Sequence, residues 1–161
     1  MTNSYGSKAL RGLVAIRMPV ILLVLVVVVT LLTGGRFARI DNIINVMRQV
    51  SFEALIAFGM TLVIVTGGID LSVGSLVALT GVVAAIVMRS TLGLPPGVSI
   101  GLGLFCGVAT GAAIGAGSGA IVARFSIPPF IVTLAAMLIA RGFAFILCGG
   151  QPVYELPEAL M

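Results

Sequence analysis

The residue with the clearest capacity for chemistry in this sequence is Asp70. It is the only acidic residue between Glu53 and Glu155, and long apolar runs flank it on both sides. A carboxylate at this position can accept hydrogen bonds from the backbone amides of Ser72 or Val73, at the positive end of a helix that begins there. The sequence therefore predicts a hydrogen-bonded carboxylate at a break between two apolar helices.

Small and hydroxyl-bearing residues surround Asp70, and two interpretations of the segment from Gly67 to Ser75 stay open. In one, Asp70 caps a helix in a tight turn at the membrane surface, because Asp is a preferred capping residue. In the other, a broken helix lies within the membrane and lines a transport path, because ionisable residues at that depth tend to be functional. Both can hold together. The candidate transport-path residues are Asp70, Ser72, Thr66, Gly67, Gly68 and Gly74.

Most residue types that enzymes use for catalysis are missing. The sequence has no histidine, and its only lysine is Lys8. A Walker A loop needs Gly-Lys-Ser/Thr, so none can form, and histidine general bases, histidine metal sites and Ser-His-Asp triads are excluded. A phosphate cradle at Gly67 and Gly68 also fails, because no lysine is available and Asp70 would repel the anion. We therefore expect no catalytic residue, no metal site and no cofactor bound by this chain.

The composition sets the class of protein that must hold these residues. Hydrophobic residues make up 60% of the chain and charged residues only 9%, with a mean hydropathy of +1.27. A soluble domain carries about 25% charged residues. The sequence therefore predicts an integral membrane protein in contact with lipid. The net charge of +4 does not indicate nucleic acid, because the basic residues are dispersed and form no stripe.

Five apolar stretches are long enough for membrane spans, which need about 20 residues each. They cover approximately residues 18–33, 43–66, 71–88, 97–123 and 130–147, and the second begins with an amphipathic turn or two. In lipid only helices and closed barrels satisfy the backbone, and these runs lack the alternation of barrel strands. We predict an all-α, polytopic transmembrane helix bundle of about five spans, broken or tightly turned between Gly67 and Ser75.

The ends of the chain suggest a simple division. Residues 1–17 are polar and basic, and no acidic residue precedes Asp41. We interpret them as a cytoplasmic tail, because basic flanks favour the cytoplasmic side and the first helix usually dominates, although the remaining arginines do not decide the orientation. No A-x-A cleavage site follows Thr33, so we expect an uncleaved first span. Residues 18–161 then form one transmembrane domain.

The fourth apolar stretch carries a regular stripe of glycines. A step of four residues rotates by only about 40° around a helix with 3.6 residues per turn, so the stripe drifts slowly along one face. Stripes of small residues let helix backbones approach closely in lipid. We interpret this stripe as a helix-packing surface, with a pore-lining face as the alternative. Its members are Gly103, Gly107, Gly111, Gly115 and Gly119.

Other polar residues in the spans receive modest roles. Arg141 is expected to snorkel toward the headgroups, with Glu53 as an alternative partner. Cys106 and Cys148 lie in apolar surroundings and are expected to be free thiols. Four threonines are expected to bond back to their own helix backbone. These are Thr61, Thr66, Thr80 and Thr133.

Five strings in this sequence resemble a known family of membrane proteins. They begin at Asn45 (NVMRQVS), Gly59 (GMTLVIVTGGIDLSVGS), Ile127 (IPPFIVTL), Ile139 (IARG) and Gly149 (GGQPV). Together they cover roughly residues 40–161, in the order and spacing found in the permease subunits of ribose-type (monosaccharide) ATP-binding-cassette importers. The longest string contains Asp70 and its neighbours.

The resemblance implies a multi-pass permease of the bacterial inner membrane that carries out no covalent chemistry. Two permease subunits, identical or different, would form the pathway. A pair of cytoplasmic ATPase subunits would bind ATP and rock the permease between two access states, and a periplasmic binding protein would deliver the sugar. Members of this family are about twice as long, so the chain resembles an N-terminal half. The cytoplasmic loop that docks the ATPase lies in the other half.

Three functions stay open at this point. The first is the importer subunit, for a monosaccharide such as ribose, galactose or xylose, or for another small polar solute such as a nucleoside or a branched-chain amino acid. The second is a channel or secondary carrier built from two copies of a five-helix unit. The third is a membrane scaffold held together by the glycine stripe, or a permease fragment without transport activity.

Overall fold

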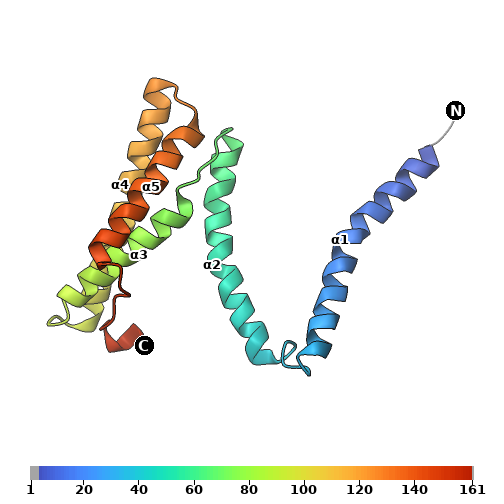
Figure 1. Ribbon diagram of the computed structural model, residues 1–161, viewed down its shortest axis with the longest axis horizontal. Coiled ribbons are helices and arrows are strands. Elements are labelled where there is room, and N and C mark those ends of the chain that lie inside the picture. Colours follow the sequence, from blue (N-terminus) through green and yellow to red (C-terminus); the bar gives the residue numbers. More distant parts are fainter. Residues whose placement is uncertain (1–3, 161) are drawn as a thin grey trace. The chain divides into compact units, whose positions relative to one another are not determined.

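The described part of the chain is built entirely from helices. The computed structural model describes residues 4–160, with side chains described from Ile16 onward except that of Glu158. Within this range there are five α-helices, one short 3-10 helix and no strand, as the sequence predicts (Figure 1). The α-helices are α1 (Ser4–Leu32), α2 (Ile40–Val65), α3 (Val73–Ser90), α4 (Pro96–Phe125) and α5 (Pro129–Cys148), and the 3-10 helix is η1 (Glu158–Leu160).

Four of the described helices, α2 to α5, are long and apolar enough to cross a membrane. In α1 the described apolar stretch, Ile16–Leu32, is shorter than in these four. The helix itself begins at Ser4, so the residues expected as a separate tail continue into α1 without a helix boundary at Arg17. The prediction of a polytopic helical bundle is therefore confirmed, and four of the five expected spans are long and apolar enough to cross a membrane in the described part of the chain.

The chain divides into two compact units, Met1–Leu55 and Ile56–Met161. In the first unit, side chains on both sides of the α1–α2 connection hold the backbone of Phe37. Thr33 Oγ1 accepts a hydrogen bond from the Phe37 amide at 3.2 Å, and Asn42 Nδ2 donates to the Phe37 carbonyl at 2.8 Å. Both backbone groups at this turn are thus satisfied before α2 begins.

The second unit is organised around α3. Helices α4 and α5 both pack extensively against α3, whereas they contact each other much less (Figure 1). The core of this unit consists of Leu79 from α3 with Ala140 and Ala144 from α5, flanked by partly buried aliphatic side chains. The small alanines let α5 lie close to α3, because no bulky side chain separates the two backbones.

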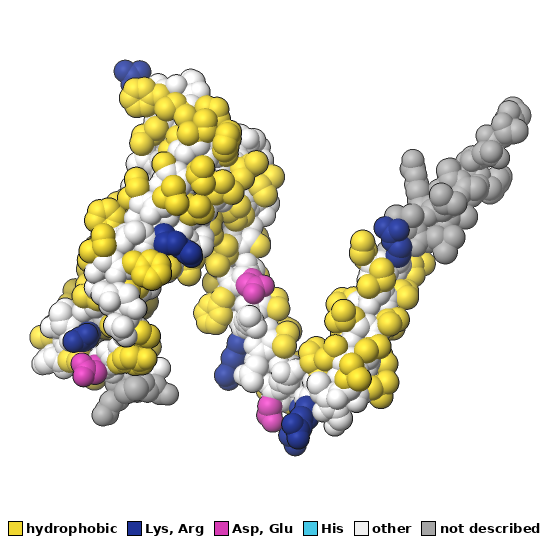
Figure 2. Space-filling view, in the orientation of Figure 1, with side chains coloured by type: hydrophobic (Ala, Val, Ile, Leu, Met, Phe, Trp, Pro, Cys, Tyr) yellow, Lys and Arg dark blue, Asp and Glu magenta, His cyan; other side chains and the backbone are white. Residues whose placement is uncertain are grey.

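The surface of the second unit is apolar. Phe58, Leu62 and Val65 on α2 are all more than two-thirds exposed, and so are Phe105 and Val108 on α4. Figure 2 shows hydrophobic side chains over most of the visible face of the helices, with few charges among them. Such a surface is stable against lipid or against further helices, and it is far more apolar than the surface of a soluble monomer.

Proline marks the start of both later helices. Pro96 is the first residue of α4 and Pro129 the first residue of α5, positions at which the missing amide proton costs no helical hydrogen bond.

Between α3 and α4, the fully buried Ser99 donates to the Met88 carbonyl at 2.9 Å and shares a hydrogen bond of 2.8 Å with Thr91 Oγ1. This pair of hydroxyls closes the turn between the two helices.

Candidate functional site

The end of α2 is set by Gly67. This glycine has a φ of +78°, a conformation that other residues adopt only with strain. Its amide donates to the Ile64 carbonyl at 2.9 Å, and the amide of Gly68 donates to the Val63 carbonyl at 3.0 Å. These two bonds are the pair that closes a helix ending in a left-handed residue. The sequence therefore stops α2 at Val65 and turns the chain sharply.

Gly68 allows the turned chain to pass close to the start of α5. A Cβ atom at this position would lie 3.2 Å from Val63 Cγ1 and 3.6 Å from Pro129 Cβ. A methyl group at this position would therefore be crowded by the Val63 side chain and in direct contact with Pro129. The second glycine thus brings the segment between α2 and α3 against α5.

Asp70 is a hydrogen-bonded carboxylate at the break between α2 and α3, as the sequence predicts, but it is not the N-cap of α3, because Ser72 occupies that position and no side chain caps the helix. Its Oδ1 accepts hydrogen bonds from the Ser72 amide at 2.7 Å and from Ser72 Oγ at 2.6 Å, and Ser72 is almost fully buried. This is a turn closed by an Asp side chain two residues before the donor. The Ser72 carbonyl then accepts the first helical bond, from the Leu76 amide at 2.8 Å. Of the two amides considered in the sequence, only that of Ser72 donates to Asp70.

Thr133 on α5 fixes the backbone on both sides of Asp70. Its hydroxyl accepts a hydrogen bond from the Leu71 amide at 3.2 Å and lies 3.1 Å from the Ile69 carbonyl, to which it can donate. It also lies 3.3 Å from the Phe130 carbonyl of its own helix. Thr133 is only 7% exposed, so its hydroxyl links α5 directly to the peptide groups that flank the carboxylate.

The sequence alone did not predict this role of Thr133. The expected bond to its own helix is present, but the link to residues more than sixty positions earlier is not visible in one sequence. The non-helical backbone between α2 and α3 was the only indirect sign in the sequence of such a partner. Residues between α2 and α3 lack the regular helical partners, and buried amides and carbonyls must find others, of which a polar side chain on a neighbouring helix is one kind.

The six candidate transport-path residues fall into two groups. Four of them, Gly67, Gly68, Asp70 and Ser72, form the connection that packs against α5 through Thr133 and Pro129. The other two lie at its edges. Thr66 is exposed and donates to the Val63 carbonyl at 2.7 Å, and Gly74 lies exposed in the first turn of α3, where a Cβ atom would meet no described atom within 4 Å.

The first half of the glycine stripe lies against α3. Gly103 is buried, and a Cβ atom there would overlap the Met88 side chain and come within 2.8 Å of the Ala84 carbonyl oxygen. At Gly107, also buried, a Cβ atom would lie 3.0 Å from the Thr80 carbonyl oxygen. Only glycine permits this separation between the two helices.

The second half of the stripe has no such neighbour. At Gly111 a Cβ atom would lie 3.2 Å from Thr80 Cγ2, whereas at Gly115 and Gly119 no described atom lies within 4 Å. The slow rotation of the stripe carries its later members away from α3. Three of the five glycines therefore contact α3, and the last two face open space in the described part of the chain.

Charged and thiol groups elsewhere in the second unit have few interactions. Arg141 is exposed and forms no ion pair with the described residues, and Cys106 and Cys148 are free. The ion pair found among the described residues joins Arg89 to Glu155 at 3.5 Å, with side chains 58% and 72% exposed. Such an exposed pair contributes little to stability.

The sequence of this chain is similar to those of membrane transport proteins. Residues 42–155 match the family model described as "Branched-chain amino acid transport system / permease component". The ribose import permease RbsC of Escherichia coli (strain K12) is 46% identical over 132 residues, which are 82% of this chain and 39% of the relative. RbsC of Bacillus subtilis is 44% identical over 135 residues, or 84% of this chain and 40% of the relative.

A fructose permease shows the same partial overlap. The fructose import permease protein FrcC of Rhizobium meliloti is 34% identical over 140 residues, or 84% of this chain and 36% of the relative. The chain thus spans about two-fifths of the length of the curated relatives it matches. No solved structure matches the chain significantly. The connection between α2 and α3, with Thr133, lies wholly within the residues that the family model matches.

Proposed function

The chain belongs to the family of permease components of branched-chain amino acid transport systems, and from this premise we propose that it forms part of the translocation pathway of an ATP-driven importer. It is a multi-pass membrane protein, with four helices long and apolar enough to span. The proposed solute is a monosaccharide of the ribose type or a similar small polar molecule. The names of the ribose and fructose import permeases among its relatives support this choice.

The observation that carries the proposal is the half-buried carboxylate at the break between α2 and α3. Asp70 Oδ1 is engaged by Ser72, while Oδ2 has no hydrogen-bond partner among the described residues. A sugar presents many hydroxyl donors, and a hydroxyl–carboxylate hydrogen bond is among the stronger ones. Backbone that leaves the helical state at membrane depth is tolerated where it lines a cavity or is buried in protein. We assign Asp70 to such a lining.

The other subunits of the importer are proposed from the resemblance to the family. A second permease subunit, identical or different, would complete the pathway across the bacterial inner membrane. Cytoplasmic ATPase subunits would use the ATP, so this chain would need no cofactor, and a periplasmic binding protein would deliver the solute. The basic residues before Met18 favour a cytoplasmic N terminus. A channel, a secondary carrier or an inactive fragment is the less favoured alternative.

Two substitutions at Asp70 distinguish a role in closing the turn before α3 from a role in solute transport. Asn keeps an oxygen that can accept the hydrogen bond from the Ser72 amide and so can close the same turn, but it removes the charge; Ala removes both. Each variant is built into a chimera in which this chain replaces the 132 matched residues of Escherichia coli RbsC, and uptake of radiolabelled ribose is measured in cells. Glu155→Gln, which removes a largely exposed carboxylate, is the matched control.

A role in the pathway predicts that Asp70→Asn and Asp70→Ala both lose most uptake at an unchanged membrane level, while Glu155→Gln retains it. Normal uptake by Asp70→Asn with a loss only for Asp70→Ala would mean that Asp70 only closes the turn before α3 and does not contact the solute. Uptake that continues in the chimera without ATP hydrolysis, driven by an ion gradient, would contradict the importer proposal itself.

A further inference from the structure

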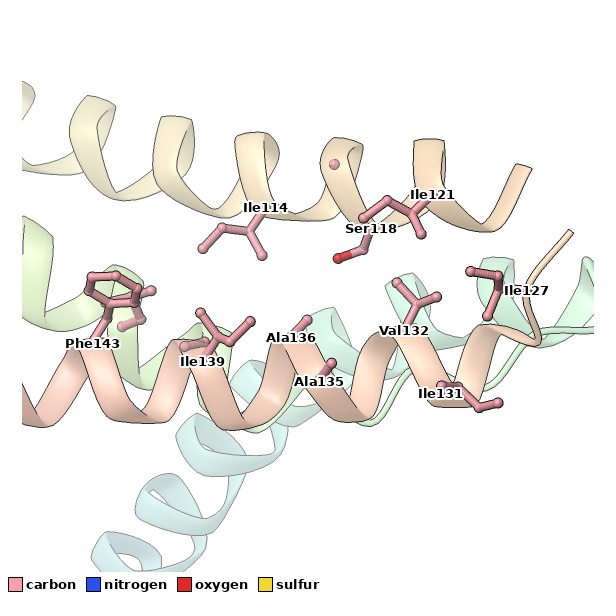
Figure 3. A pocket seen from close by; sticks show the side chains of 13 residues that line it. Ile114, Ser118, Ile121, Ile127, Ile131, Val132, Ala135, Ala136, Ile139 and Phe143 are labelled. Carbon is pink, nitrogen blue, oxygen red and sulfur yellow. The ribbon is translucent and has the colours of Figure 1, made fainter. Parts of the chain in front are cut away.

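Helices α4 and α5 contact each other only sparsely and leave a groove between them, next to the short connection that joins them. Its volume is about 520 Å³, and Leu79 of α3 forms its base. Figure 3 shows Ile114 and Ser118 of α4 pointing toward Ala136 and Ile139 of α5 across this space. The groove is lined almost entirely by aliphatic side chains. A sugar would lose hydrogen bonds there without replacement, so this groove is no part of a pathway for a polar solute.

The shape of the groove fits an elongated occupant. Its lining residues on α5 run from Ile131 to Phe143, which corresponds to about 18 Å along the helix at 1.5 Å per residue. That length is more than three helical turns. An extended apolar channel open along its side matches a helix lying between α4 and α5 better than it matches a compact ligand.

The middle of the groove is lined by small residues. Figure 3 shows Ser118 of α4 facing Ala136 of α5, Gly117 and Ala135 also line the groove, and bulkier residues lie toward its two ends. In lipid, small residues at this position let a third backbone approach closely, which is how membrane helices associate. An acyl chain gains nothing specific from them, because it packs equally well against larger aliphatic groups.

Ser118 is the polar side chain among the residues that line the groove. Some hydroxyls on the described helices bond back to their own helix, for example Thr61 of α2 to the Ala57 carbonyl and Thr110 of α4 to the Cys106 carbonyl. None of the hydrogen bonds among the described residues involves Ser118 Oγ, and Figure 3 shows this oxygen directed into the groove. In a hydrocarbon environment such a hydroxyl favours a neighbour that offers a hydrogen-bonding group. A helix provides one, and a lipid tail does not.

We propose that the α4–α5 groove is the docking site of a further apolar membrane-spanning helix of the same permease, supplied by the part that its relatives possess outside the matched region. The matched region is only 39–42% of the length of the ribose permeases, so more than half of each relative is available to provide it. This proposal depends on family membership and not on which solute is carried. Its failure would leave the proposed function untouched.

The first test is a site-specific cross-link. The full chain is co-expressed with the remaining length of Escherichia coli RbsC, the part outside the 132 matched residues. Ser118→Cys, in a background of Cys106→Ala and Cys148→Ala, carries a benzophenone photoprobe into the groove. Ala120→Cys is the matched control, because two residues rotate by about 200° and place the probe on the opposite, exposed face at nearly the same depth.

We expect position 118 to cross-link to an apolar helix of the added RbsC piece, identified by mass spectrometry, with loss of this product at position 120. Equal cross-linking at both positions would overturn the proposal. So would products at position 118 that contain only phospholipid or a second copy of this chain. Absence of any product with the RbsC piece would likewise count against it.

The second test fills the groove. Ala136→Leu adds volume where α5 faces Ser118, and Ala120→Leu adds the same volume on the opposite face of α4. Because overpacking a close helix contact weakens it, we expect the amount of RbsC piece that co-purifies with Ala136→Leu to fall about tenfold. Helical circular dichroism should be unchanged in both variants. Equal co-purification with the two variants would show that the helix binds elsewhere.

Discussion

Two connections in the second unit hold their helices by different means. Between α3 and α4, the backbones meet at Gly103 and Gly107 with no room for a methyl group. Between α2 and α3, seven non-helical residues are held by hydrogen bonds from Asp70 and Thr133. Close packing of two backbones is weakened when a single methyl group is added, whereas a few hydrogen bonds can be exchanged for others. The close contact between α3 and α4 is therefore suited to holding these helices in one position. The segment between α2 and α3 is suited to changing its conformation.

The largest expected effect lies at the packed connection. Gly103→Ala adds a methyl group that overlaps Met88 and the Ala84 carbonyl, and we expect the free energy of unfolding to fall by about 2 kcal/mol. The measurement is loss of helical circular dichroism during titration of micelles with a denaturing detergent. Gly115→Ala is the matched control on the same helix. With no atom near its Cβ, it should leave stability unchanged or raise it slightly, because Ala favours the helix over Gly.

Equal destabilisation by these two glycine variants would contradict the division of the stripe into a packed half and an open half. It would mean that Gly115 contacts another helix even in the isolated chain.

An intermediate effect is expected at the hydrogen-bonded connection. Thr133→Val keeps the shape of the side chain but removes the hydroxyl that faces the Leu71 amide and the Ile69 carbonyl. We expect a loss of about 1 kcal/mol in the free energy of unfolding, since hydrogen bonds between membrane helices are individually weak. Hydrogen exchange should become faster at the Leu71 amide and remain unchanged in the middle of α4. Thr133→Ser, which keeps the hydroxyl, should restore slow exchange.

If exchange at Leu71 is as slow in Thr133→Val as in the original chain, α5 does not hold the segment through this hydroxyl. A global rise in exchange across α3 and α4 would show instead that the two connections are not independent.

The smallest effect is expected at the hydroxyl pair that closes the α3–α4 turn. Ser99→Ala removes the bonds to the Met88 carbonyl and Thr91 Oγ1, but Thr91 also lies within reach of the Val87 carbonyl at 2.7 Å. We expect a loss of about 0.6 kcal/mol by the same detergent titration. A loss as large as that of Gly103→Ala would mean that hydrogen bonds, rather than close packing, hold this connection as well.

Much of this fold follows from the sequence because lipid imposes a simple rule. The limits of α3, α4 and α5 lie within two residues of those predicted, since an apolar run must be helical in lipid, Pro begins α4 and α5, and Gly149 ends α5. The stripe on α4 predicted a close contact, but not that the contact would stop after Gly111. Which neighbour a drifting stripe meets, and over what length, depends on the direction of the adjacent helix.

The site was predictable only in its local part. The bond from the Ser72 amide to Asp70 involves neighbours in sequence, and the sequence predicted that the amide of Ser72 or Val73 would donate to this carboxylate. The bonds to Thr133 depend on where α5 lies, which no local preference encodes. The sequence therefore identified Asp70 as the charged residue of the segment, and the structure identified Thr133 as the residue that holds the adjacent backbone.

The long separation between Thr133 and its partners has a consequence for biosynthesis. The chain passes the Leu71 amide 62 residues before it reaches Thr133. At translation rates of about 5–20 residues per second, the peptide groups beside Asp70 wait several seconds for their partner while α3 and α4 are being made. During that interval they must be hydrated or held by the insertion machinery. The connection after α2 is thus synthesised before the three helices that follow it, yet it completes its hydrogen bonds only when α5 emerges.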